Sequence, residues 1–182
     1  MSKRALILID IQNDYFADGK WPLVGMHNAA ANAARILAAA RAAGDRVIHV
    51  RHEFEAEDAP FFAPGSDGAR THASVLPQAD EAVVLKHQVN AFLGTDLKAQ
   101  LDAAAIEQVT LVGAMSHMCI AAAARASADF GYDTTVVHDA CATHDQTFDG
   151  ITVAAAQVHA ANMAALAFAY AQVVSTEQYL AG

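Results

Sequence analysis

The chain has 182 residues, a size that fits one domain, so a single domain over residues 1–182 is expected. Its formal net charge is −9, and it has no cluster of lysines and arginines that would bind the phosphates of nucleic acid. Although 54% of the residues are hydrophobic, polar residues interrupt every apolar run well before the roughly 18 residues that a membrane span needs. The composition therefore predicts no membrane segment and favours a small molecule as the partner.

The first apolar run, residues 5–9, is cut short by Asp10, so it predicts a buried strand and not a secretion signal. Cys119 and Cys141 are the two cysteines of the chain. Without a signal, a disulfide framework is not expected, and a reducing cytoplasm is the predicted location. A free thiol is then available for chemistry.

Short apolar runs alternate with helical patterns along the whole chain. Buried strands are predicted at residues 5–9, 46–50, 82–85, 109–112, 134–137 and 172–175. Helices are predicted at residues 28–43, 96–104, 118–130 and 150–169, two of them followed by a glycine stop. This alternation predicts an α/β fold with three layers, a doubly wound parallel sheet between helices on both faces.

One long irregular stretch, residues 52–79, interrupts the pattern and contains three prolines. A connection of this length is typical of a lid or binding loop, and the alternative is a mobile surface insertion without a role.

Three polar residues stand where predicted strands end: Asp10, Lys86 and, after a short turn, Cys119. Each has an ordinary explanation, namely helix capping for Asp10, snorkelling for Lys86 and apolar packing for Cys119. However, carboxyl ends of parallel strands meet at one crevice, where an acid, a cation and a thiol together form a nucleophile with its activators.

The predicted helix start at Cys119 suggests a lowered thiol pKa, because the positive end of the helix dipole favours a thiolate. Cys141 has no such setting and is assigned to packing. His49 and His52, with Glu53, Asp58 and His72 nearby, could hold a metal ion. Their spacing matches no compact ligand motif, so a structural or pocket-lining role is preferred and no metal or cofactor is predicted.

Three segments resemble the isochorismatase-like cysteine hydrolases: LIDIQND at residues 8–14, Lys86 with NAFLGTDL at residues 90–97, and VGAMSHMC at residues 112–119. The resemblance covers essentially the whole chain. It implies a Rossmann-like sheet of six parallel strands in the order 3-2-1-4-5-6, assembled into homodimers or homotetramers.

The resemblance also implies roles for individual residues. Asp10 would be the general base, Lys86 would hold the thiolate and orient Asp10, and Cys119 would attack the carbonyl carbon of an amide to give a thioester. A cis peptide bond is expected between Ala114 and Met115, and the amides of Met115 and Cys119 would form the oxyanion hole. The expected substrate pocket consists of Gln12, Phe16, Phe92, His117 and Met118.

Departures from subfamilies narrow the expected chemistry. The Asp-x-His metal motif of nicotinamidases is replaced here by Arg51-His52-Glu53, and the thiol that true isochorismatases usually lack is present as Cys119. Hydrolysis of a small amide, carbamoyl or ureido compound is therefore expected. Ether hydrolysis of the isochorismatase type and a non-catalytic, redox-responsive or ligand-binding role are the alternatives.

Further aromatic residues could line the pocket or belong to ordinary packing: Trp21, Phe54, Phe61 and Phe62.

Overall fold

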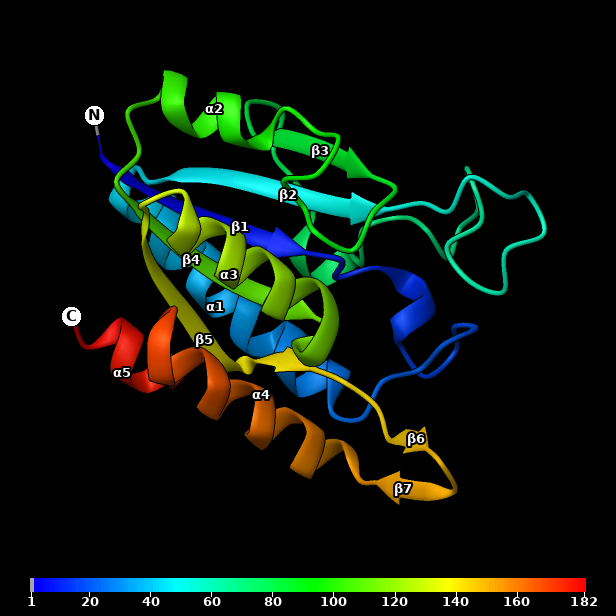
Figure 1. Ribbon diagram of the computed structural model, residues 1–182. Helices are drawn as coiled ribbons and strands as arrows, with labels where there is room; N and C mark the ends of the chain where they lie inside the picture. The colour runs from blue at the N-terminus through cyan, green and yellow to red at the C-terminus, as the bar shows by residue number, and fades with distance from the viewer. Residues whose placement is uncertain (1) are drawn as a thin grey trace.

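The computed structural model describes residues 2–182 and contains a central sheet of six parallel strands (Figure 1). The strand order is β3-β2-β1-β4-β5-β8, which confirms the predicted order, with β8 as the sixth strand of the sheet. The strands are β1 (Arg4–Ile9), β2 (Arg46–His52), β3 (Ala82–Lys86), β4 (Gln108–Ala114), β5 (Asp133–Ala142) and β8 (Gln172–Val174).

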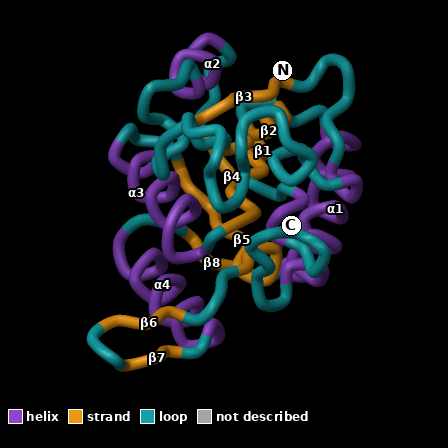
Figure 2. Tube along the Cα trace, turned by 90° about the vertical axis from the view of Figure 1, so that its right-hand side faces the viewer, coloured by secondary structure: helices purple, strands orange, loops and turns teal. Residues whose placement is uncertain are grey.

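Helices cover both faces of the sheet, as Figure 2 shows with helices on either side of the strands. One face packs against α2 (Leu97–Ala103), α3 (Ala121–Asp129) and α4 (Ala155–Ala169), and the other against α1 (Met26–Ala43) and α5 (Thr176–Leu180). Alternate residues of β1 serve the two faces: Ile7 and Ile9 join the first core, Leu6 and Leu8 the second. Residues 5–9 of β1 are all apolar because this central strand is buried on both faces.

The start of the predicted helix 150–169 was wrong. Residues Gln146–Phe148 (β6) and Ile151–Val153 (β7) instead form an antiparallel hairpin, and α4 starts at Ala155. The hairpin turn uses Asp149 and Gly150, both with positive φ, as an Asp-Gly turn does. Ile151, Thr152 and Val153 are β-branched and favour the strand.

The predicted helix 118–130 also has a different start. The chain leaves β4 through a π-helical turn, η3 (Ser116–Ile120), and the regular helix α3 begins only at Ala121. Cys119 therefore lies within η3, ahead of the first turn of α3. π-helical turns of this kind are frequent at functional sites.

The long connection between β2 and β3 is tied to the body of the protein. Asp14 is a buried residue of the short helix η1 (Asn13–Tyr15), and its carboxylate accepts a hydrogen bond of 2.7 Å from the amide of Phe62, which is fully buried. A second short helix, η2 (Ala73–Val75), follows in the same connection. These contacts anchor the connection at Phe62 and Val75, which are buried, while most of its other residues are exposed or half-buried. Within residues 2–182, no helix has the length and apolarity needed to cross a bilayer.

Candidate active site

The side chains of Asp10, Lys86 and Cys119 meet beyond the carboxyl ends of β1, β3 and β4. The Lys86 Nζ atom lies 2.8 Å from Asp10 Oδ2 and donates a hydrogen bond of 3.3 Å to Cys119 Sγ. Asp10 and Lys86 are fully buried, and Cys119 is 6% exposed. The structure thus brings together the acid, the cation and the thiol predicted from the strand ends.

The backbone at Asp10 turns its carboxylate toward Lys86. Strict alternation along β1 would send Asp10 to the face covered by α1, together with Leu8. Asp10 instead has a φ of 52°, a left-handed conformation that aspartate tolerates better than most residues. The alternation ends at Ile9, and the carboxylate reaches the side of the sheet on which Lys86 lies.

A glycine on the neighbouring strand makes room for this bend. Gly113 of β4 pairs with Ile9 and has a φ of 126°. A Cβ atom at this position would lie 1.9 Å from the carbonyl oxygen of Ile9, far inside van der Waals contact. The close approach of β4 to the end of β1 therefore requires glycine.

Lys86 remains charged although it is buried. Burial alone would lower its pKa, but the neighbouring Asp10 and Cys119 raise it, and the net direction is upward. The ammonium also donates a hydrogen bond of 3.1 Å to His52 Nδ1. A buried ammonium with this set of acceptors can hold an anion that forms beside it.

The Cys119 thiol is held on a firmly anchored turn. The Met115 carbonyl accepts hydrogen bonds from the amides of Met118 and Ile120, at 3.0 and 3.2 Å. The Ser116 hydroxyl lies 2.8 Å from His159 Nδ1 of α4, which joins η3 to the next layer. The peptide bond between Ala114 and Met115 is cis, at the position where the resemblance implied one.

The expected lowering of the thiol pKa was wrong. Burial, followed by the negative charge of Asp10, raises the pKa of Cys119 to about 12, and the opposing effect of Lys86 is smaller. The helix-dipole argument failed because it considered the local backbone without the desolvation and the carboxylate that the fold adds. The resting site consequently holds a neutral thiol next to a carboxylate and an ammonium.

Comparison with known proteins identifies the family of the chain. A model of the isochorismatase domain matches residues 4–178. The chain belongs to the isochorismatase family. The uncharacterized isochorismatase family protein YddQ of Bacillus subtilis is 44% identical over 176 residues, which cover 97% of this chain and 98% of YddQ. A solved isochorismatase-hydrolase structure from Oleispira antarctica is 58% identical, with a TM-score of 0.95 and coverage of 98% and 96%.

A relative with a stated reaction is the maleamate amidohydrolase of Pseudomonas putida. It is 32% identical over 155 residues, which cover 75% of this chain and 71% of that enzyme. The family thus consists of hydrolases and includes amidohydrolases.

Each residue predicted to line the substrate pocket has its own contacts within the protein. The Gln12 amide is used within the protein, donating to the carbonyls of His52 and Ala69 at 2.8 Å each. Phe16 stacks on His72 with ring centroids 3.6 Å apart, and Phe92 packs edge-on against Phe130 at 5.3 Å.

Two other predicted pocket residues lie on η3. His117 shares a hydrogen bond of 2.7 Å with the Thr143 hydroxyl, and Met118 is 38% exposed. Substrate contact by Gln12, Phe16, Phe92, His117 and Met118 stays a prediction.

Four further aromatic residues gather in one cluster beside the catalytic group. The His52 ring packs against Phe54, and Phe54 packs against Phe61, with centroid separations of 4.7 and 5.1 Å. Phe61 stacks on Trp21 at 4.8 Å and contacts Phe62 at 5.0 Å. The cluster adjoins the catalytic group through the His52 ring, which contacts Lys86 Nζ at 3.1 Å.

The residues considered for a metal site have separate partners. His49 Nε2 lies 3.0 Å from Glu81, and His72 Nδ1 lies 2.9 Å from the Ser74 hydroxyl. Glu53 is paired with Arg51. Their side chains are therefore engaged in different parts of the structure.

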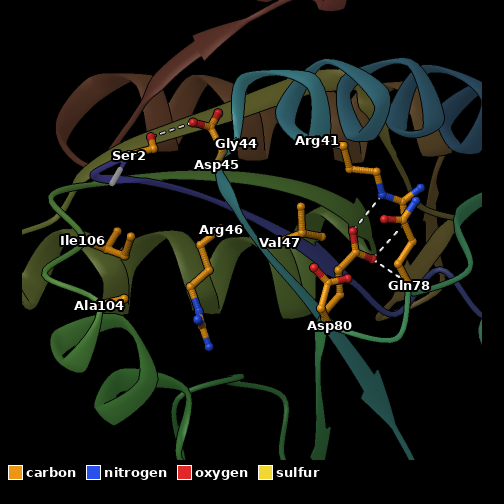
Figure 3. Close-up of a pocket in the computed structure, with 11 residues that line it drawn as sticks. Ser2, Arg41, Gly44, Asp45, Arg46, Val47, Gln78, Asp80, Ala104 and Ile106 are labelled. Carbon is orange, nitrogen blue, oxygen red and sulfur yellow. Dashed lines mark hydrogen bonds and ion pairs between the residues drawn. The ribbon is translucent and has the colours of Figure 1, made fainter.

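A pocket elsewhere in the molecule has no connection with this chemistry. Figure 3 shows it around Arg41, Asp45, Arg46 and Asp80, near the amino end of β2, whereas the catalytic group lies beyond the carboxyl ends of the strands. The Arg41 guanidinium there is occupied by Glu81, with contacts of 2.7 and 2.8 Å.

Proposed function

We propose that this member of the isochorismatase family hydrolyses a C–N bond of a small amide, carbamoyl or ureido compound through a thioester on Cys119. The observation that carries the proposal is the contact of one buried ammonium, Lys86, with both the Asp10 carboxylate and the Cys119 thiol. The similarity to maleamate amidohydrolase supports the same class of reaction.

The first step follows from the charge state of the group. Because the thiol is neutral at rest, a base must take its proton before sulfur can attack, and Asp10 is the carboxylate beside it. The proton moves from Sγ to the Asp10 carboxylate as Sγ bonds to the substrate carbonyl carbon. Lys86 retains its charge and stabilises the developing negative charge on sulfur.

The tetrahedral intermediate then carries a negative charge on the former carbonyl oxygen. In this proposal the backbone amides of Met115 and Cys119 donate to that oxygen, and loss of one such donor typically costs about 3 kcal/mol of transition-state stabilisation. Asp10 returns its proton to the leaving nitrogen, and ammonia or an amine departs. A water molecule, deprotonated by Asp10, hydrolyses the thioester and regenerates the thiol.

The two rival functions differ in what they require of the thiol. A redox-responsive role needs an accessible thiolate, but Cys119 is buried and its pKa is about 12. Ether hydrolysis of the isochorismatase type would not need the thiol. The proposal rests on a thiol that is positioned between a base and a cation.

Ammonia release from a panel of small amides, carbamoyl and ureido compounds tests the proposal. Wild type is expected to release ammonia from at least one compound, and Cys119→Ala is expected to lose at least about 10³-fold in rate. Cys141→Ala is the matched control, because this second buried cysteine contacts the Val137 carbonyl and not the catalytic group. Turnover of the same compound by Cys119→Ala at the wild-type rate would overturn the proposal.

A further inference from the structure

The Lys86 ammonium has one acceptor more than the three-residue mechanism uses. Its Nζ atom lies 2.8 Å from Asp10 Oδ2, 3.3 Å from Cys119 Sγ and 3.1 Å from His52 Nδ1. An ammonium has three N–H bonds, and each acceptor can take one of them. The ion pair with Asp10 and the hydrogen bonds to Cys119 and His52 together orient the ammonium between the acid, the nucleophile and the ring.

The sheet itself places His52 at this position. His52 and Lys86 are the last residues of β2 and β3, and they are direct partners in the parallel register. Partners on neighbouring strands project to the same face. The Gln12 side chain fixes the strand end further, since its Oε1 accepts a hydrogen bond of 2.7 Å from the His52 amide. His52 is 7% exposed, so the ring has little freedom.

The ring can accept a hydrogen bond because it is neutral. Burial, followed by the positive charge of Lys86, lowers the pKa of His52 to about 4. Among the other groups that face the ring, His87 lowers the pKa further, while Asp10 and the Gln88 backbone act in the opposite direction. With Nδ1 accepting from Lys86, the ring proton is on Nε2.

We propose that His52 is a positioning residue of the hydrolase site, one that directs the Lys86 ammonium toward Asp10 and Cys119 by accepting a hydrogen bond at Nδ1. This inference rests on the proposed function, and it adds a fourth side chain to the catalytic group. His52 acts through Lys86 and takes no proton from the substrate. Without this acceptor the ammonium could rotate, and its contact with the thiol would no longer be fixed.

Two substitutions separate hydrogen bonding from packing. His52→Leu fills the space but removes the acceptor, whereas the amide oxygen of His52→Asn can occupy the Nδ1 position and accept from Lys86. His52→Leu is expected to lower kcat by about 10- to 100-fold with little change in KM, the range for a lost hydrogen bond to a charged group. His52→Asn is expected to stay within about threefold of wild type.

His49→Leu is the matched control. His49 is a second buried histidine of β2, also with a lowered pKa, but its ring contacts Glu81 and not Lys86. We expect His49→Leu to lower the thermal stability while leaving kcat unchanged. Equal losses of kcat in His52→Leu and His49→Leu would reduce His52 to a structural residue.

A measurement without substrate distinguishes failure of this inference from failure of the proposed function. The pH dependence of Cys119 alkylation by iodoacetamide, followed by intact mass, reports how well Lys86 stabilises the thiolate. Because the pKa of Cys119 is about 12, the profile is compared as the alkylation rate between about pH 7 and 9, which is proportional to the thiolate fraction. This rate is expected to fall in His52→Leu and to stay unchanged in His52→Asn and His49→Leu. An unchanged profile in His52→Leu would overturn the inference, even if Cys119 proves essential for turnover.

Discussion

Replacing Lys86 by methionine tests how far the buried acid depends on the ammonium. Both side chains are fully buried, with Nζ 2.8 Å from Asp10 Oδ2. Methionine keeps an unbranched apolar chain but leaves the Asp10 carboxylate without its neighbouring positive charge. Removing one partner of a buried ion pair costs about 3–5 kcal/mol, since the remaining charge stays buried without compensation.

Urea unfolding at pH 7 measures this cost. With a denaturant slope of about 2 kcal/mol per M, Lys86→Met should lower the midpoint by about 1.5–2.5 M. The double variant Asp10→Asn/Lys86→Met removes both charges and should regain more than about 1 kcal/mol relative to Lys86→Met. The reasoning is refuted if Lys86→Met costs less than about 1 kcal/mol, or if the double variant is less stable than Lys86→Met.

Three more predictions concern backbone, pH and assembly. Gly113→Ala should destabilise the chain by about 2–3 kcal/mol in thermal unfolding and lower activity, because the added Cβ would displace Ile9 beside the acid. The pKa of His52 is about 4 in the folded chain and about 6.5 in the unfolded chain, so the unfolded chain takes up this proton first as the pH falls. The free energy of unfolding should therefore drop by roughly 3 kcal/mol between pH 6.5 and 4. Urea titrations of His52→Asn should lack this drop, because asparagine does not titrate. The predicted homodimer or homotetramer should form through α4, because this helix has no Asp, Glu, Lys or Arg and Phe168 on it is 91% exposed. Phe168→Glu should therefore reduce the molecular mass measured by light scattering.

Each of these three has a result that contradicts it. Gly113→Ala with wild-type stability would mean that the strands can separate without cost. Parallel pH profiles for wild type and His52→Asn would mean that the ring protonates as easily in the folded chain as in the unfolded one. A monomeric mass for the wild type would remove the basis for an interface on α4.

The strand ends made much of the candidate site predictable. Asp10, Lys86 and Cys119 each follow a buried apolar run, and in a parallel sheet such positions converge whatever the details of packing. The alternation of strands and helices likewise predicted the layers, whereas the strand order followed from the resemblance to the isochorismatase-like hydrolases. The Asp149-Gly150 turn and the β-branched residues after it could have revealed the β6–β7 hairpin, but the apolar pattern of α4 obscured where the helix begins.

Other features depend on information that local sequence does not contain. On sequence grounds His52 was expected to have a structural or pocket-lining role, because the sequence could not show that His52 lies opposite Lys86. That pairing depends on the register between β2 and β3, which only the folded sheet sets. The charge state of Cys119 was misjudged for a related reason. Its pKa is governed by burial and by Asp10, a residue more than a hundred positions away along the chain.

The most direct test of the central claim is intact-protein mass spectrometry of a rapidly quenched reaction with an amide that the wild type hydrolyses. A thioester intermediate predicts a wild-type species heavier by the mass of the acyl group, located on Cys119 by peptide mapping. Cys119→Ala should show neither this species nor ammonia release. Ammonia release by Cys119→Ala at the wild-type rate, without any acylated species, would contradict the account and point to direct attack by water.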